Sequence, residues 1–154
     1  MARICVAEDD ADIRNVIAFT LLDGGHEVLA VKDGRAALDA VSSENPDILV
    51  LDLMLPEMDG LEVLDTLESK GLRAGTRVLV VSARSSEQDR LVGFEHGADL
   101  YLAKPFDPVE FLQAVGDLLE SSPEALQDKR QQERDRSALL AQLENVFPDA
   151  NPMT

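Results

Sequence analysis

Short apolar segments alternate with longer amphipathic ones along this sequence, and this pattern limits the folds that the chain can adopt. Five segments rich in β-branched or aliphatic residues recur along the chain, and they read ICVA (residues 4–7), HEVLAV (26–31), DILVLD (47–52), RVLVVS (77–82) and DLYLAK (99–104). Three of them are nearly continuous apolar runs, which is the pattern of a parallel strand covered on both faces. We therefore predict five parallel strands.

Helical patterns fill the intervals between these strands. Apolar residues recur there at helical spacing and glycines mark several ends, so we expect helices over residues 11–22, 34–42, 61–68, 86–96 and 107–120. Strict alternation with right-handed crossovers predicts an α/β, doubly wound, flavodoxin-like sheet in the order 2-1-3-4-5 with helices on both faces. Ligands of such sheets bind at the carboxyl ends of the strands, so the chemistry is expected at that edge.

The size and charge of the chain limit its function classes. Its 154 residues can hold one domain, which we place at residues 1–120, and a tail of residues 121–154. The net charge of −16 would repel nucleic acid, and no cluster of Lys and Arg offsets it, so direct nucleic-acid binding is not expected. Cys5 has no second cysteine to pair with. Without a signal-peptide pattern or a long apolar stretch, we expect a cytoplasmic protein that does not enter a membrane.

Charged and polar residues gather at the predicted strand ends. Three acids follow the first strand, and the third, fourth and fifth strands end on further polar residues; the set is Glu8, Asp9, Asp10, Asp52, Ser82 and Lys104. This combination suits an oxygen-liganded Mg²⁺ beside a phosphoryl group. We expect Asp52 to act as the nucleophile and form an acyl phosphate, with Mg²⁺ and Lys104 offsetting charge and Ser82 donating to the same oxygens.

Each of these residues also has an ordinary explanation. Asp10 directly precedes a predicted helix, so we interpret it as a helix N-cap and leave it out of the metal set. Asp52 could merely end a strand, Ser82 could be a turn residue, and Lys104 could be a surface charge. Together, however, these residues form the combination of groups that an active site needs. The functional interpretation therefore depends on the whole combination and not on any single residue.

Residues 2–120 resemble the receiver domain of bacterial two-component response regulators. The stretches that carry the resemblance read DLMLPEMDG (52–60), VVSAR (80–84) and GADLYLAKPF (97–106). The resemblance implies that a histidine kinase or phosphotransfer domain phosphorylates Asp52. It also implies that Ser82, Tyr101 and Lys104 report the change to a protein-interaction surface.

The same resemblance implies a metal site and a dimer interface. Mg²⁺ would be held by Glu8, Asp9, Asp52 and the backbone carbonyl of Met54, with Glu8 standing where many members have Asp. Met54 and Arg84 make the domain most similar to receivers of OmpR-type regulators, and their bulk is expected to slow attack by water.

OmpR-type receivers dimerise through the fourth helix, the fifth strand and the fifth helix. Arg90 and Glu110 fit one charge pair of that interface. At a second pair both charges are replaced, by Leu100 and Ala114. We therefore expect a homodimer through this surface, with Leu100 in an apolar contact.

Two other function classes share part of this pattern with a signalling switch. Aspartyl-phosphate phosphohydrolases also use an Asp nucleophile with Mg²⁺, but they usually carry a second acid two residues later, where this chain has Met54. A pure interaction module would have lost one of Asp9, Asp52 and Lys104, and all are present. We expect a switch and not a turnover enzyme. The sequence leaves open the cognate kinase, the output pathway, the phosphoryl lifetime, and whether the chain is a stand-alone regulator or a piece of a longer one.

The tail lies outside the resemblance. Ser122–Glu124 is typical of a helix start, so we expect a helix from there to about Phe147, with a polar and solvated first half. Its second half places Leu139, Leu143 and Val146 at helical spacing. We expect this stripe to be buried, either against its own receiver domain or, through residues 139–147, against a second subunit or an output partner. A linker is the remaining alternative.

Overall fold

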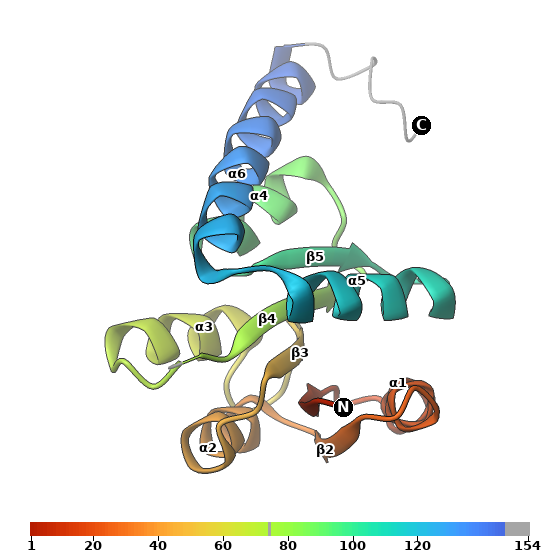
Figure 1. The fold of residues 1–154 in the computed structure, drawn as a ribbon. Coiled ribbons are helices and arrows are strands. Elements are labelled where there is room, and N and C mark those ends of the chain that lie inside the picture. The colour runs from red at the N-terminus through yellow and green to blue at the C-terminus, as the bar shows by residue number, and fades with distance from the viewer. Residues whose placement is uncertain (74, 147–154) are drawn as a thin grey trace.

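A parallel sheet of five strands runs through the centre of the molecule (Figure 1). The computed structural model describes residues 1–73 and 75–146. The strands are β1 (Arg3–Ala7), β2 (Glu27–Val31), β3 (Ile48–Asp52), β4 (Arg77–Ser82) and β5 (Leu100–Ala103). Their spatial order is β2-β1-β3-β4-β5, and every neighbouring pair is parallel, so the predicted topology is confirmed.

Helices cover both faces of this sheet, as predicted. They are α1 (Ala11–Asp23), α2 (Gly34–Glu44), α3 (Gly60–Ser69), α4 (Glu87–Glu95), α5 (Pro108–Glu120) and α6 (Pro123–Val146). Buried side chains of α1 and α5 pack on one face, while those of α2, α3 and α4 pack on the other. Strand β3 shows the alternation that supplies both layers, because Leu49 and Leu51 join one cluster whereas Ile48 and Val50 join the other.

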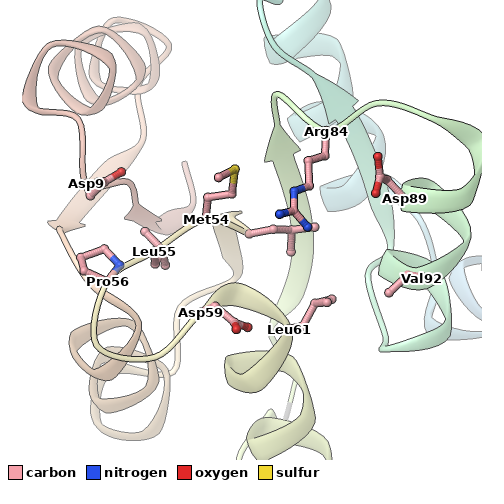
Figure 2. Close-up of a pocket in the computed structure, with 10 residues that line it drawn as sticks. Asp9, Met54, Leu55, Pro56, Asp59, Leu61, Arg84, Asp89 and Val92 are labelled. Atoms are coloured by element: carbon pink, nitrogen blue, oxygen red, sulfur yellow. The ribbon is translucent and has the colours of Figure 1, made fainter.

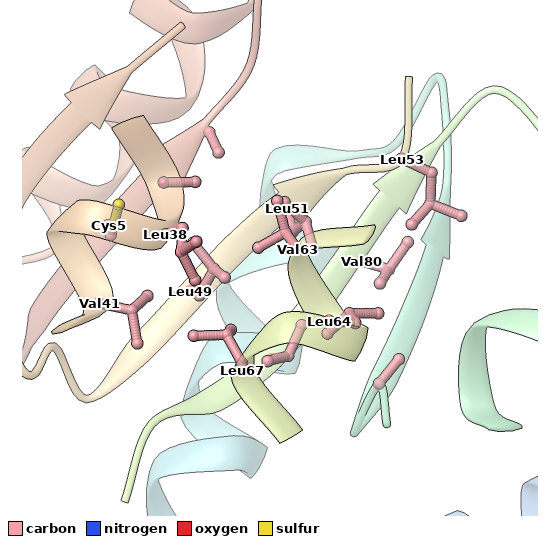
Figure 3. Packing of buried hydrophobic residues seen from close by; sticks show 14 of the residues in the cluster. Cys5, Leu38, Val41, Leu49, Leu51, Leu53, Val63, Leu64, Leu67 and Val80 are labelled. Atoms are coloured by element: carbon pink, nitrogen blue, oxygen red, sulfur yellow. The ribbon is translucent and has the colours of Figure 1, made fainter. Parts of the chain in front are cut away.

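Aliphatic side chains build most of the core, in line with an aromatic content of 4%. Figure 3 shows Leu38 and Val41 of α2 and Leu64 of α3 packed over Leu49 and Leu51 of β3. Each fully buried side chain of this size favours folding by roughly 1.5–3 kcal/mol relative to an exposed one. A sheet that is covered on both faces in this way holds its strand ends rigidly.

N-cap residues set where the helices begin, and they explain the later starts of α4 and α5. The side chain of Asp10 accepts hydrogen bonds from the backbone N–H groups of Asp12 (2.9 Å) and Ile13 (3.1 Å), which confirms its interpretation as a cap. Ser86 and Asp107 cap α4 and α5, so each of those helices begins one residue later than predicted.

Helix α6 begins as the sequence predicts. The Ser122 hydroxyl accepts a hydrogen bond from the backbone N–H of Ala125 at 3.1 Å, and Pro123 is the first helical residue. The helix then runs alongside α4 beyond the edge strand β5 (Figure 1). Within the residues that the structure describes, the tail therefore forms one helix that contacts α4.

The face that α6 turns toward the domain differs from the predicted one. Leu139, Leu143 and Val146 are 59%, 46% and 65% exposed, whereas Ser137 and Ala141 are buried. Small side chains let two helices approach closely, and this part of α6 accordingly turns its small residues inward and the predicted apolar stripe outward. Burial of the predicted stripe against its own domain is thus wrong. Phe147 lies outside the described residues, and packing of the stripe on a partner stays a prediction.

The predicted polar first half of α6 is also only partly solvated. Arg130 and Arg134 are half-buried, and Leu126 is 5% exposed within the core cluster of α1 and α5. Among the described helices, none is both long enough and apolar enough to span a membrane.

Candidate functional site

Four strand ends bring the predicted side chains to one edge of the sheet. β1 leads into Glu8 and Asp9, β3 ends on Asp52, β4 ends on Ser82, and Lys104 follows β5. Parallel strands all point the same way, so their carboxyl ends share an edge. The structure therefore gathers at one place residues that lie up to 96 positions apart in sequence.

Lys104 joins two buried carboxylates. Its Nζ lies 2.9 Å from Oδ2 of Asp52 and also pairs with Oε1 of Glu8. Glu8 is 1% exposed and Asp52 is 5% exposed, so both charges are largely shielded from water. One ammonium offsets only one of the two carboxylates, which leaves an excess negative charge at the strand ends.

Glu8, Asp9 and Asp52 form an acidic cluster open to solvent on the Asp9 side. One carboxylate oxygen of each lies within 4.8 Å of the others. Repulsion within such a group is relieved by a hard divalent cation, which prefers oxygen ligands. The residues thus fit a divalent metal. The part predicted for the backbone carbonyl of Met54 stays a prediction, while the N–H of that residue donates to Oδ1 of Asp52 at 3.0 Å.

The protonation states follow from burial and charge. Burial raises the pKa of Glu8, the neighbouring Asp52 raises it further, and Lys104 opposes the rise. Burial by itself would lower the pKa of Lys104, but its hydrogen bonds to Glu8 and Asp52 outweigh that effect and raise it. The ammonium therefore stays charged at neutral pH, and the raised pKa lets Glu8 take up a proton at a higher pH than an ordinary glutamate does.

Ser82 and Tyr101 meet at the loop between β4 and α4. The Ser82 Oγ accepts a hydrogen bond from the backbone N–H of Arg84 at 3.1 Å, and the Tyr101 hydroxyl donates to the carbonyl of Arg84. The Tyr101 ring lies under the guanidinium of Arg90, 5.3 Å from its centroid. Burial raises the pKa of Tyr101, so its hydroxyl remains a donor at neutral pH. Both predicted switch side chains, Ser82 and Tyr101, are thus hydrogen-bonded to the backbone of Arg84.

A hollow of about 560 Å³ opens beside the acidic cluster. Asp9, Met54, Asp59, Arg84 and Asp89 are among the residues that line it. In Figure 2, Met54 lies on the loop after β3 and Arg84 extends from the end of β4 into the same space. Met54 and Arg84, the two bulky residues predicted to slow attack by water, thus line a hollow that they share with Asp9.

Two residues that shape this edge were not predicted. Nη1 of Arg14 donates to the carbonyls of Glu8 (2.9 Å) and Asp9 (3.3 Å), which fixes the acidic loop. Gly60 lies so close to the end of β3 that a Cβ there would be 2.7 Å from the carbonyl oxygen of Asp52. The glycine belongs to the MDG signature, but no sequence pattern states which backbone it approaches.

Three residues of the predicted dimer interface line one groove, whereas Arg90 lies over the ring of Tyr101. A groove of about 230 Å³ over β5 is lined by Leu100, Glu110 and Ala114 together with Lys129 of α6. Glu110 is exposed and Leu100 is half-buried. Helix α6 therefore borders this surface in the same chain, a contact that the sequence did not predict. The dimer itself stays a prediction.

Comparison with known proteins relates this site to one family. The family model for the response regulator receiver domain matches residues 4–116, which is the strand-and-helix core without α6. Receiver domains bind a divalent metal at an acidic pocket, and the cluster of Glu8, Asp9 and Asp52 is such a pocket.

Curated relatives with similar sequences are OmpR-family regulators. The response regulator MprA of Mycolicibacterium vanbaalenii is 43% identical over 117 residues, which cover 76% of this chain and 50% of the relative. The alkaline phosphatase synthesis transcriptional regulatory protein PhoP of Bacillus subtilis is 37% identical over 120 residues, covering 78% of this chain and 49% of the relative. The chain thus spans about half the length of these proteins.

Solved structures agree in fold. The receiver domain of the Francisella response regulator 1452 superposes with a TM-score of 0.72 at 31% identity, covering 77% of this chain and 96% of that one. The chemotaxis response regulator CheY4 of Vibrio cholerae gives a TM-score of 0.72 at 29% identity, covering 77% of this chain and 98% of that one.

Proposed function

The chain belongs to the response regulator receiver domain family, and on this premise we propose that Asp52 accepts a phosphoryl group in a Mg²⁺-dependent reaction. Phosphorylation-dependent switching is the general function of this family, and receiver domains of OmpR-type regulators interact with histidine kinases. The observation that supports the proposal best is the pairing of Asp52 with Lys104 at 2.9 Å beside two further carboxylates.

The two oxygens of Asp52 have different surroundings. Oδ1 accepts the backbone N–H of Met54, and Oδ2 faces Lys104. In the proposed step a carboxylate oxygen attacks the phosphorus of a phosphohistidine on a histidine kinase or phosphotransfer domain. A P–O bond forms, the P–N bond breaks, and the imidazole keeps its electron pair. Lys104 offsets charge on the transferring oxygens.

Mg²⁺ would be held by Glu8, Asp9 and Asp52, with the Met54 carbonyl as a further ligand, and it supplies positive charge to the phosphoryl oxygens. Glu8 carries one methylene more than Asp, and a water between its carboxylate and the metal is consistent with that length. Mg²⁺ is proposed over other divalent cations because hard, octahedral, partly hydrated sites with carboxylates and phosphate oxygens suit it.

Ser82 and Tyr101 couple the phosphoryl group to the surface formed by α4, β5 and α5. Both side chains bond to Arg84, so a turn of the Ser82 hydroxyl toward a phosphoryl oxygen releases the N–H of Arg84 and alters the loop that Tyr101 holds. The result is a change of surface, and the chain acts as a switch that turns over only its own acyl phosphate.

Intact-mass analysis after treatment with acetyl phosphate tests this function. We expect one added phosphoryl group in the presence of Mg²⁺, none in EDTA, and none in Asp52→Asn. Asp39→Asn serves as a matched control, because Asp39 is exposed on α2 and away from the acidic cluster. Full labelling of Asp52→Asn, or full labelling in EDTA, would falsify the assignment.

Phosphate release distinguishes the switch from a phosphohydrolase. A switch forms about one acyl phosphate per chain and then turns over slowly, whereas a phosphohydrolase releases phosphate over many cycles. Rapid multiple turnover of acetyl phosphate, or of other phosphate monoesters, would favour the enzyme class.

A further inference from the structure

Helix α6 covers α4 in an antiparallel contact. Nε of Arg130 lies 3.2 Å from Oδ1 of Asp99, which follows the end of α4. Seven residues further along α6, the Ser137 hydroxyl donates to Oε2 of Glu87, the first residue of α4, at 3.4 Å. Helix α6 therefore occupies a face of α4, next to the groove over β5, within the same chain.

The attachment is firm at one end of α6 and weak beyond it. Leu126 is 5% exposed and belongs to the core cluster that includes Leu118 of α5. Further along, the bond of Ser137 to Glu87 is long, and the buried Nε of Arg134 forms no hydrogen bond with any described residue. A buried N–H without an acceptor opposes the contact. The first turn is thus anchored by apolar packing, while the remainder is held by the ion pair of Arg130 with Asp99, small residues and one long hydrogen bond.

The beginning of α4 is tied to the residues of the phosphorylation switch. Ser82 accepts a hydrogen bond from the N–H of Arg84, and Glu87 follows three residues after Arg84. Movement of this loop carries the Glu87 carboxylate with it. The same carboxylate is the acceptor that holds Ser137 of α6.

Resting on the proposed phosphorylation of Asp52, we propose that phosphorylation releases residues 130–146 of α6 from α4 while Leu126 keeps the first turn anchored. Release uncovers α4 and the border of the groove over β5, so α6 closes this surface in the unphosphorylated chain and opens it in the phosphorylated one. A largely polar helix without tertiary contacts is marginally stable, so the released segment loses protection of its backbone amides.

Amide hydrogen exchange followed by mass spectrometry tests this release in the full chain. With acetyl phosphate and Mg²⁺, we expect exchange within residues 130–146 to become at least roughly tenfold faster than with Mg²⁺ alone. Peptides from β1 and β3 should exchange at an unchanged rate. Asp52→Asn should show no change in α6 under the same treatment.

A matched pair of variants tests the contact without phosphorylation. Ser137→Asp places a carboxylate against Glu87, so α6 should exchange fast even without acetyl phosphate. Gln132→Asp adds the same charge on an exposed position of α6 and should leave its exchange slow. If Ser137→Asp also speeds amide exchange in β3, the substitution has destabilised the whole domain. The test of the release then depends on α6 exchange in the wild type with and without acetyl phosphate.

Intact mass measured on the same samples separates the two proposals. A labelled Asp52 together with unchanged or slower exchange in α6 would overturn the release and leave the phosphoacceptor function standing. Absence of the label would overturn the proposed function and the release with it.

Discussion

Replacing Lys104 by Met should destabilise the metal-free protein in a way that depends on pH. The Lys104 ammonium pairs with both Glu8 and Asp52, whose side chains belong to residues that are only 1% and 5% exposed. Without it, two buried negative charges face each other. Glu8 then takes up a proton, because burial and the neighbouring Asp52 already raise its pKa.

Two limits give the size of the loss. A buried carboxylate left without its partner costs about 3–5 kcal/mol of unfolding free energy. Protonation of Glu8 in the folded state avoids this penalty but has a cost of its own. That cost is about 1.4 kcal/mol for each pH unit above the ordinary carboxyl pKa of 4.5, which gives roughly 3.4 kcal/mol at pH 7. The smaller cost sets the ceiling. Since the raised pKa of wild-type Glu8 already carries part of this cost, we expect a loss of at most about 3 kcal/mol at pH 7 and below about 1 kcal/mol at pH 5.

The sign follows from linkage. A carboxyl group whose pKa is raised in the folded state favours folding below its unfolded pKa, and this contribution is lost as pH rises. The gap between Lys104→Met and the wild type should therefore widen from pH 5 to pH 7. Saturating Mg²⁺ should narrow it, because a bound cation replaces the missing charge.

Urea unfolding in EDTA at several pH values, followed by circular dichroism, measures this loss. Lys70→Met is the matched control, because it removes the same charge from an exposed residue at the opposite edge of the sheet. If Lys104→Met loses no more stability than the control, or loses the same amount at pH 5 and pH 7, the reasoning about the buried acids is wrong.

Three further predictions test the surroundings of the site. Tyr101 is the only tyrosine of a chain without tryptophan, so absorbance titration at 295 nm reports its raised pKa directly. The titration midpoint of the folded protein should lie above about 10, and the stability that Tyr101 contributes should fall as pH rises past that midpoint. A midpoint at or below about 10 would contradict the burial argument. Gly60→Ala should cost about 1–3 kcal/mol and slow phosphorylation, because a Cβ would lie 2.7 Å from the Asp52 carbonyl oxygen. Gly116→Ala is the control and should not destabilise, because apart from its own helix backbone nothing lies within 4 Å of the added Cβ. Leu100→Asp should weaken phosphorylation-dependent association in light scattering; unchanged association would place the dimer interface elsewhere.

The strand-and-helix order and the location of the site could be predicted from the sequence. Apolar runs such as DILVLD and RVLVVS show both the strand and its double burial, since each residue of a parallel strand faces one of two covered layers. Once the alternation is known, the carboxyl ends must share an edge, and Glu8, Asp52 and Lys104 meet there as expected. Asp10 as an N-cap and Ser122 at the start of α6 follow from equally local signals.

The contacts between elements could not be predicted from these local patterns. Arg14 binds backbone carbonyls of the loop after β1, and Gly60 lies against the backbone at the end of β3. Hydrophobic periodicity cannot predict such contacts, because it depends only on the residues within one element. The same holds for α6. Its apolar stripe at Leu139 and Leu143 predicted a buried face, yet the helix meets α4 through Ser137 and Ala141. Close approach of two helices depends on the size of the side chains between them and on the charges across the contact, and both belong to the pair of helices and not to either sequence alone.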